Sequence, residues 1–310
     1  MSNTIASLNR KISSAADLQA VVRTMKAMAA SNINQYERAV NASDGYFRTL
    51  QLGLAACLQK NKAFESQDSA IPVIPTTQPY AKAENSRIGA VVFGSDQGLV
   101  GQFNDVMIEF VTHTLNELTG RKVIWGVGER IQSGLANCHF EEGERFALPG
   151  SIGAITPLVG RILMDIEAQR EKFEITEVYL FHNQPQSKSA YAPACQRLLP
   201  LDEQWQQELC SIRWPTSNLP EIINNRQTTL LAFINEYILL SLFRACTESL
   251  ASENASRLLA MQRAEKNIEE LLENFNQTYH RIRQSNIDEE LSDIISGFGA
   301  LQGISSQKRS

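Results

Sequence analysis

The ends of this 310-residue sequence lack the residues that interrupt helices. All ten prolines lie between Pro72 and Pro220, and glycine is absent before Gly45 and from residue 221 to residue 296. Glycine disfavours a helix interior by about 1 kcal/mol and proline by about 3 kcal/mol. A typical globular helix has roughly 11 to 12 residues. The two uninterrupted runs therefore predict long terminal helices, with an ordinary helical bundle whose turns lack both residues as the alternative.

The sequence also lacks a long apolar run and a leader-like start. The longest mostly apolar stretch, Leu230 to Phe243, contains Asn235 and Glu236, whereas a bilayer span needs about 20 predominantly apolar residues. Residues 1–11 have neither the apolar centre of a secretory signal nor an Arg-rich presequence. We therefore expect a soluble, cytosolic protein.

Cysteine pairs and a basic excess are missing as well. The five cysteines are widely spaced, with no Cys-x-x-Cys, which favours buried, reduced thiols. Lys and Arg number 29 against 34 Asp and Glu, a net charge of −5. This balance argues against nucleic acid as a partner.

The first sixty residues contain two rows of mostly apolar positions with a seven-residue repeat, which is typical of a coiled-coil seam. Polar residues enter the rows at Gln19, Lys26 and Ser43. One row is Ile5, Ile12, Gln19, Lys26, Ile33, Val40, Phe47 and Leu54, and the other is Leu8, Ala15, Val22, Ala29, Tyr36, Ser43, Leu50 and Cys57.

A matching seam occurs near the other end, so the two terminal helices are predicted to pair. Residues 1–70 carry a net charge of +3 and residues 221–310 a net charge of −3, although exposed ion pairs add only about 0.2 to 1 kcal/mol each. The second seam comprises Leu258, Met261, Ala264, Ile268, Leu271, Phe275, Tyr279 and Ile282, and it resumes at Ile287, Leu291 and Ile294.

The middle of the chain alternates between strand and helix patterns. Residues 61–85 are rich in Pro, Ser, Thr and Gln and are interpreted as an exposed linker. The βαβ order that follows predicts a parallel sheet with crossover helices. Strands are expected at residues 87–95, 122–128, 176–182 and 189–199, and helices at 102–118 and 156–171.

A Gly-rich turn at residues 94–104 is the most suggestive local signal. It follows a strand and precedes a helix, a placement that suits phosphate binding at a helix N-terminus. Its glycines are spaced G-x-x-x-G-x-x-G, however, and no Lys-Ser/Thr follows, so neither nucleotide fingerprint is met. A structural turn is favoured, with nucleotide binding as the alternative.

Other catalytic patterns are missing. The four histidines are far apart, with no His-Glu-x-x-His and no Gly-x-Ser-x-Gly. Glu269, Glu270 and Glu273 fit the solvated face of a helix. We therefore predict no catalytic residue, no cofactor and no metal, and a scaffold rather than an active site.

This organisation resembles the gamma subunit of F-type ATP synthases. Residues 22–31 (Val-Arg-Thr-Met-Lys-Ala-Met-Ala-Ala-Ser) and the turn at 95–104 are similar to two family segments. The most specific resemblance is at residues 248–264, followed by residues 279–284, and it extends over about residues 4–301. Departures include Gln97, Val100 and Asn32, where the family usually has Arg, Cys and Lys.

The resemblance implies an α/β protein in which a long antiparallel coiled coil of the terminal helices carries an inserted Rossmann-like α/β domain. The domains expected are an N-terminal coiled-coil helix at 1–60, a linker at 61–85, the Rossmann-like domain at 86–217 and a C-terminal coiled-coil helix at 218–310. The Gly-rich turn is then a family feature without a known phosphate role.

The resemblance also implies a function, that of the non-catalytic central-stalk rotor. The shaft turns inside a ring of alpha and beta subunits, binds the epsilon subunit and the ring of c subunits, and couples ion flow to ATP synthesis or hydrolysis. Its implied location is peripheral, on the cytoplasmic side of the bacterial inner membrane. A sodium-translocating branch, a stand-alone nucleotide-binding protein with helical arms and an unrelated helical scaffold are alternatives.

Partner-contact residues follow from matched positions in the family. Met25 and Lys26 are expected near loops of the catalytic subunits, and Arg257, Gln284, Asp288 and Glu290 are expected to make polar contacts with the ring. Lys26 occupies a seam position that favours an apolar residue. For each of these residues, the solvated face of a long helix is the alternative.

Overall fold

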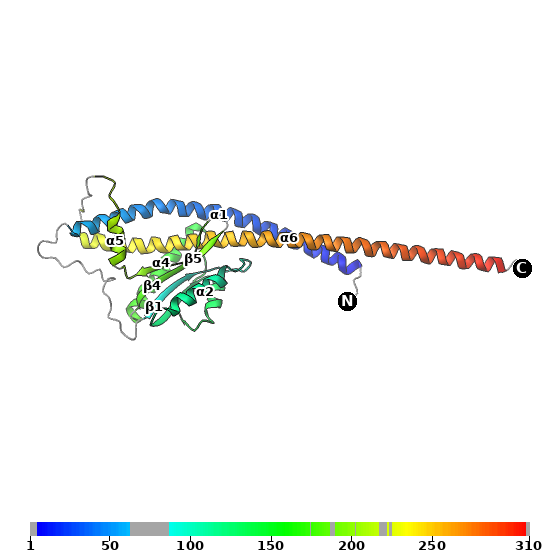
Figure 1. The fold of residues 1–310 in the computed structure, drawn as a ribbon, viewed down its shortest axis with the longest axis horizontal. Coiled ribbons are helices and arrows are strands. Elements are labelled where there is room, and N and C mark those ends of the chain that lie inside the picture. The colour runs from blue at the N-terminus through cyan, green and yellow to red at the C-terminus, as the bar shows by residue number, and fades with distance from the viewer. Residues whose placement is uncertain are drawn as a thin grey trace. The chain divides into compact units, whose positions relative to one another are not determined.

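Two long helices form the ends of the described chain. The computed structural model describes residues 5–62, 87–173, 175–186, 190–201, 203–216, 222 and 225–307. Helix α1 spans Ile5–Lys62 and α6 spans Arg226–Gln307 (Figure 1). The prediction of long terminal helices is confirmed, and neither run is broken by turns. Beyond residue 62, the predicted linker lies outside the described residues.

A five-stranded sheet with its helices lies between α1 and α6 in the sequence. The elements are β1 Arg87–Phe93, α2 Phe103–Asn116, β2 Arg121–Val127, α3 Glu129–Leu135, β3 Glu141–Glu142, η1 Ile152–Ala154, α4 Ile155–Phe173, β4 Ile175–Pro185, β5 Tyr191–Leu199 and α5 Glu203–Ser211. The chain divides into two compact units, residues 29–259 and residues 1–28 with 260–310. Each long helix contributes to both units.

The sheet has the order β3-β2-β1-β4-β5. Strand β1 pairs in parallel with β2 and with β4, as the βαβ order predicted. The last pair differs from that expectation, because β4 and β5 are antiparallel. Five residues separate these strands, and such a short connection suits a hairpin, whereas a parallel pair needs a crossover of a dozen or more residues.

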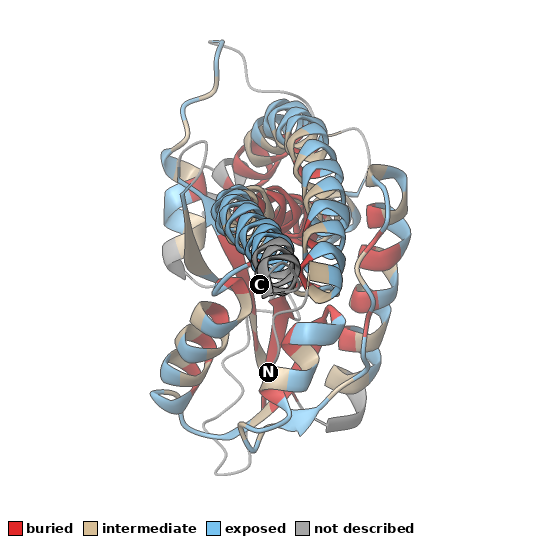
Figure 2. Cartoon of the chain, turned by 90° about the vertical axis from the view of Figure 1, so that its right-hand side faces the viewer, coloured by how far each residue is buried: buried red, intermediate tan, exposed pale blue. Residues whose placement is uncertain are grey.

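The two faces of the sheet bury different sets of side chains, because successive residues of a strand point to opposite faces. On β1, Ile88, Ala90 and Val92 join a cluster with helices α2 and α3. Val91 and Phe93 belong to a larger cluster with α1, α4 and α6. In Figure 2 the buried residues, drawn in red, lie where the helices of this unit face the sheet.

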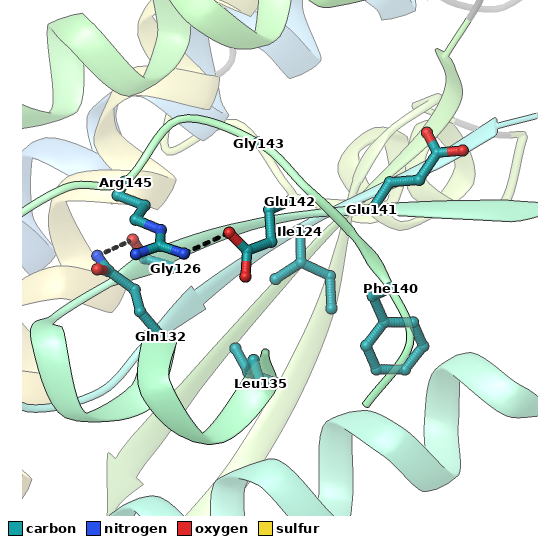
Figure 3. Close-up of a pocket in the computed structure, with 9 residues that line it drawn as sticks. All are labelled: Ile124, Gly126, Gln132, Leu135, Phe140, Glu141, Glu142, Gly143 and Arg145. Carbon is teal, nitrogen blue, oxygen red and sulfur yellow. Dashed lines mark hydrogen bonds and ion pairs between the residues drawn. The ribbon is translucent and has the colours of Figure 1, made fainter. Parts of the chain in front are cut away.

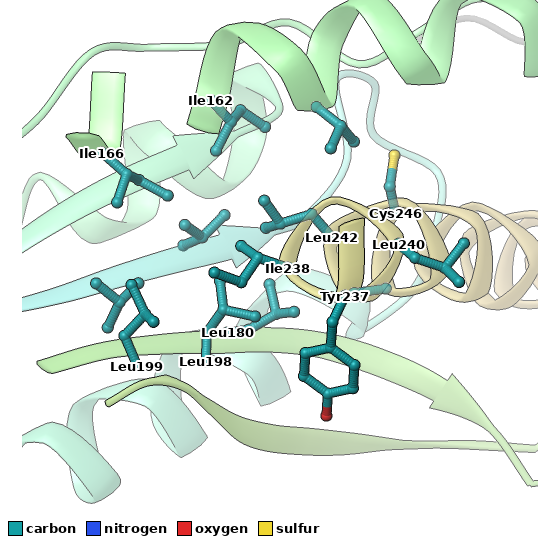
Figure 4. Packing of buried hydrophobic residues seen from close by; sticks show 14 of the residues in the cluster. Ile162, Ile166, Leu180, Leu198, Leu199, Tyr237, Ile238, Leu240, Leu242 and Cys246 are labelled. Carbon is teal, nitrogen blue, oxygen red and sulfur yellow. The ribbon is translucent and has the colours of Figure 1, made fainter. Parts of the chain in front are cut away.

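Helix α6 is the centre of the larger cluster. Ile238 and Leu242 lie between Leu180 on β4 and Ile162 on α4, whereas the ring of Tyr237 points away from α4 (Figure 4). One 18-residue window of α6 has a mean hydropathy of 1.4, and half of it is buried within the protein. By length and composition the helix is apolar enough to cross a membrane. Its apolar residues here supply the core of the larger cluster.

In the unit of residues 1–28 and 260–310, α1 and α6 run in opposite directions. Arg23 pairs with Glu265, and Gln19 bonds to Glu269. Lys11 lies over the ring of Phe275. The residue number falls along α1 as it rises along α6, so the pair is antiparallel, as predicted.

The predicted seam of α1 is confirmed along its length. In the row that begins at Leu8, every position is buried except Val22, which is half-buried. In the row that begins at Ile5, every position is half-buried except Leu54, which is fully buried.

The predicted seam of α6 is partly wrong. Leu271 is 49% exposed, whereas its neighbour Leu272 is half-buried. Ile287, Leu291 and Ile294 are exposed as well. Extending the antiparallel pairing places the first described residue of α1 near residue 282, so the described part of α1 has no residue opposite these positions.

None of the five cysteines forms a disulfide, but the prediction that all are buried is only partly confirmed. Cys57 and Cys246 are buried, Cys138 and Cys210 are half-buried, and Cys195 on β5 is exposed. Burial of part of its surface still raises the pKa of the Cys195 thiol to about 11.

Candidate functional site

Helix α6 has a buried polar face in the unit of residues 29–259. Glu248, Ser252 and Ser256 recur at four-residue spacing, which places them on one face of the helix. Their exposed fractions are 3%, 1% and 6%. Acidic side chains are almost never fully buried unless they are paired, so the partners of this polar face must be identified.

Each of the three side chains binds the α/β domain. The Glu248 carboxylate accepts a hydrogen bond from Nε2 of His182 at 2.9 Å. The Ser252 hydroxyl donates to the carbonyl of Asn183 at 2.9 Å, and the Ser256 hydroxyl donates to the carbonyl of Val100. The polar face therefore binds β4 and the turn that follows β1. Strands β1 and β4 are parallel neighbours in the sheet.

Glu248 also connects α6 to α1. Its other carboxylate oxygen accepts from Nε of Arg244 at 2.8 Å, and Arg244 pairs with Asp44 on α1 at 2.9 Å. Burial raises the pKa of Glu248, but the hydrogen bonds from His182 and Arg244 outweigh burial and hold that pKa below its usual value. The carboxylate is therefore ionised at neutral pH and is stabilised by its two hydrogen-bond donors.

A second buried pair lies one turn further along α6. Glu253, which is 4% exposed, accepts a hydrogen bond from Arg257 at 2.6 Å. Burial raises the pKa of Glu253, the charge of Arg257 lowers it, and the nearby Asp96 raises it again. The net shift is upward, because desolvation disfavours the charged form.

The Gly-rich turn is closed by its own side chains. Oδ1 of Asn104 accepts from the backbone N–H of Ser95 at 3.0 Å, and its amide donates to the Ser95 hydroxyl at 2.8 Å. The carboxylate of Asp96 accepts from the backbone N–H groups of Glu129 and Leu148. Gly94 must lack a side chain, because a Cβ there would lie 2.2 Å from Cβ of Ile131.

These contacts leave the turn unsuited to phosphate. The N–H of Ser95 is already bonded to Asn104, and the carboxylate of Asp96 adds negative charge where an anion would bind. Leu99 and Gly101 have positive φ values of 62° and 59°, and the carbonyl of Val100 between them accepts a hydrogen bond from Ser256. The turn is therefore better explained as a structural turn than as a nucleotide-binding site.

A small pocket beside the sheet edge is also too small for a nucleotide. Its volume is about 20 Å³, which is room for about one water molecule. Gln132 lines the pocket and donates to the carbonyls of Gly126 and Phe146, both at 2.9 Å. Figure 3 shows Arg145 and Glu142 paired at the same edge. Among the described residues, no cluster of His, Cys, Asp or Glu has the composition of a metal site.

The second unit has a polar cluster at the predicted seam. Lys26 forms an ion pair with Glu265, which Arg23 also approaches at 2.9 Å. Hydrogen bonds from Lys26 and Arg23 lower the pKa of Glu265. The ammonium group of Lys26 thus finds a carboxylate on the facing helix, which explains how a charged residue is accommodated at a seam position.

The six predicted contact residues fall into three groups. Met25 and Lys26 are half-buried neighbours on α1. Gln284, Asp288 and Glu290 lie together on the exposed part of α6. Arg257 is in the other unit, with 15% of its side chain exposed and its guanidinium paired with Glu253. The contacts of all six with other subunits stay predictions.

Sequence reasoning missed two features of the molecule. The first is the polar face of α6, whose regular spacing was visible but fits a solvated helix equally well. The second is a set of exposed apolar side chains on α1 outside the seam, namely Leu18, Val21 and Met28, which are 57%, 56% and 61% exposed. Their spacing of three and seven residues places them on one helix face.

Comparisons with known proteins agree on one family. The profile of the family described as ATP synthase matches residues 4–301. The ATP synthase gamma chain of Desulfitobacterium hafniense is 26% identical over 307 residues, covering 95% of this chain and 98% of the relative. Gamma chains from Glaesserella parasuis and Brevibacillus brevis are 27% and 26% identical.

Solved structures show the same fold. The rotor of the Euglena gracilis mitochondrial ATP synthase aligns with a TM-score of 0.62 at 16% identity, covering 91% of this chain and 98% of that chain. A chain from the OSCP/F1/c-ring structure of the same enzyme aligns with a TM-score of 0.64 at 17% identity, covering 96% and 94%.

Proposed function

Because this chain belongs to the ATP synthase gamma-chain family, we propose that it works as the rotating shaft of an F-type ATP synthase. The observation that carries this proposal is the match of the family profile to residues 4–301, nearly the whole chain. The confirmed antiparallel pair of terminal helices agrees with it, because a shaft needs elements that resist bending over a long distance.

We infer that the shaft acts because its two helices expose different side chains to the subunits around it. On α1 the apolar side chains of Leu18 and Val21 are exposed, while α6 exposes charged residues such as Glu269 and Glu270 in the same unit and apolar residues further along, such as Ile287. Rotation of an asymmetric shaft changes the contacts of each catalytic subunit in turn, and such differential contacts shift neighbouring subunits between states of different nucleotide affinity. The shaft itself carries no catalytic group in this proposal.

In the described part of the chain, neither the Gly-rich turn nor the pocket beside the sheet edge suits a nucleotide. The Gly-rich turn is occupied by Asn104 and Asp96, and the pocket beside the sheet edge has room for about one water molecule. The ATPase chemistry belongs to the assembled enzyme, whose alpha and beta subunits surround the shaft.

The proposed partners are the alpha and beta subunits, the epsilon subunit and the c ring. The Euglena gracilis neighbour comes from a structure of OSCP, F1 and the c-ring, which supports partners of these kinds. Through the c ring the chain is peripheral to the membrane, and we place it on the cytoplasmic side of a bacterial inner membrane.

We propose that the contacts with the ring use the residues predicted from the family. Met25 and Lys26 lie beside the exposed apolar residues Val21 and Met28 on α1, which supports a contact there. Gln284, Asp288 and Glu290 lie close along α6 to the exposed apolar residues Ile287, Leu291, Ile294 and Ile295. Arg257, which is largely buried, is the weakest of the six proposed contacts.

Co-purification tests the rotor function. A tagged copy of this chain, recovered from membranes washed at physiological salt, should bring down alpha and beta subunits and ATPase activity. A tagged variant that lacks residues 284–310 is the control, and it should recover less of both. If the full chain recovers neither subunit, the rotor function is wrong.

A further inference from the structure

We propose that Glu248, Ser252 and Ser256 of α6 form a torsional clamp that fixes the shaft to the α/β domain and transmits torque between them. These three residues are called the clamp below. The inference rests on the proposed rotor function. It assigns positioning roles to three residues to which the family resemblance alone gives no role.

The clamp bonds α6 to the α/β domain at three successive levels of the helix. Its three side chains face the carboxyl ends of β1 and β4, and they bind His182, Asn183 and Val100 at three levels along the helix. Contacts at three levels on one face resist rotation of the helix about its axis, because any turn of α6 lengthens all three hydrogen bonds together.

Apolar packing alone would resist such a turn less strongly. Dispersion and hydrophobic contacts are non-directional, so a helix that packs only through aliphatic side chains can rotate by exchanging one set of contacts for another. Hydrogen bonds weaken steeply when the donor angle is lost. The clamp therefore supplies directional resistance that Ile234 and Ile238 on the same helix cannot supply.

Burial makes the clamp costly to open. Ser252 and Asn183 are 1% and 0% exposed, so breaking their hydrogen bond leaves a carbonyl and a hydroxyl unpaired in a site that water cannot reach without further opening. Glu248 is held in addition by Arg244, which joins it to Asp44 on α1. The clamp thus binds α6 to the domain and, through Arg244, to the other helix of the shaft.

The same helix offers matched control residues. Ser241 and Ser249 are buried, at 3% and 1% exposure, and their hydroxyls have no hydrogen-bond partner among the described residues. The double variant Ser252→Ala with Ser256→Ala removes two clamp bonds. The double variant Ser241→Ala with Ser249→Ala removes the same atoms from the same helix without removing a described bond.

Hydrogen exchange on the full chain measures directly how strongly the clamp stabilises the Gly-rich turn. In the clamp variant, amides of the Gly-rich turn at residues 95–103 should exchange faster by roughly two- to tenfold, the factor expected for losing one net hydrogen bond at each site. The control variant should leave those amides unchanged. Equal exchange in the two variants would overturn the clamp.

Coupling in the assembled enzyme measures its function. In membrane vesicles that carry the complex, the clamp variant should pump fewer ions per ATP hydrolysed, while the ATPase rate per assembled complex is retained. A bead on exposed Cys195 of β5 should show wider angular fluctuations when the catalytic ring is immobilised. The control variant should match the wild type in both measurements.

The outcomes separate the clamp from the rotor function. If the wild-type chain does not assemble with alpha and beta subunits, the rotor function fails. If it assembles and the clamp variant lowers only the amount of complex, with pumping per ATP and fluctuation width unchanged, the three residues have a merely structural role and the clamp is wrong.

Discussion

Two stretches of one helix, residues 247–256 and residues 284–296 of α6, differ completely in their surroundings. In the first, polar and charged side chains are buried, and Glu248, Ser252 and Ser256 bond to the sheet and the turn after β1. In the second, polar and apolar side chains alike are exposed. The first stretch therefore has partners within this chain, while the apolar residues of the second are exposed and have no partner among the described residues.

This contrast suits a shaft that is held firmly in one place and used as a bearing in another. A helix stabilises a protein through the face it buries, since helical propensity alone is weak. The stretch at 284–296 gains little from burial within the chain, so it is available for contacts that change during rotation. The buried stretch is the natural place for a permanent connection.

The largest expected difference between a buried site and an exposed site on α6 is in the stability lost when an isoleucine is replaced by alanine. Ile234→Ala, at a site 1% exposed, should destabilise the unit of residues 29–259 by about 2 to 5 kcal/mol. Ile294→Ala, at a site 57% exposed, should change stability by no more than about 0.5 kcal/mol. Denaturant titration of the full chain checks both, and similar losses would contradict the contrast.

Replacing a carboxylate residue by alanine should also destabilise the protein more in the buried stretch of α6 than in the exposed stretch, but the difference in stability should be smaller. Glu248→Ala leaves His182 and Arg244 without their shared acceptor and should cost about 1 to 3 kcal/mol. Glu290→Ala removes an exposed carboxylate and should cost less than about 0.5 kcal/mol. Thermal unfolding of the two variants under one buffer provides the comparison. A harmless Glu248→Ala would show that the buried network is not stabilising.

Acid should weaken the pairing of α1 with α6 in the unit of residues 1–28 and 260–310. The pKa of Glu265 is lowered in the folded chain by Lys26 and Arg23, so its contribution is complete above the ordinary value of 4.5 and is lost as the pH falls through the lower folded pKa. The protection of amides in residues 8–26, expressed relative to the intrinsic exchange rate at each pH, should therefore fall below pH 4.5. Glu265→Gln should remove that fall in protection, and an unchanged profile would count against the ion pair.

Lys26→Leu should have the smallest effect on stability and a clear effect on coupling. Leucine suits a seam position, so pairing of the two helices should tighten, although Glu265 then retains only Arg23 as its described partner. ATP-driven pumping per ATP hydrolysed should change in the assembled enzyme. Lys26→Arg, which keeps the charge, is the control. Unchanged pumping in the leucine variant would argue against a role for Lys26.

The sequence pattern predicted the helices well because their periodicity is a direct consequence of burial. The row from Leu8 to Cys57 is buried at all positions but Val22, and the strands at β1, β2 and β4 lie where apolar runs indicated. The pattern did not reveal the antiparallel orientation of β5, because the same alternation of residues fits a strand in either direction.

The polar face of α6 shows a different limit of sequence reasoning. Glu248 and Ser252 are of residue types that usually lie in solvent, and nothing in their spacing identifies His182 or Asn183, more than sixty residues away, as partners. Only the folded arrangement brings them together. Likewise, Ile287 and Leu291 continue a seam in the sequence, but they are exposed because the described part of α1 has no residue opposite them.

Hydrogen exchange along α6, in the free chain and in the assembled enzyme, tests the central claim most directly. We predict that residues 284–296 gain protection on assembly with alpha and beta subunits, whereas residues 247–256 are already protected in the free chain and stay so. The opposite result, with protection gained at 247–256 and none at 284–296, would contradict the account. It would show that residues 247–256 are not held by the α/β domain of this chain and that residues 284–296 do not contact the ring.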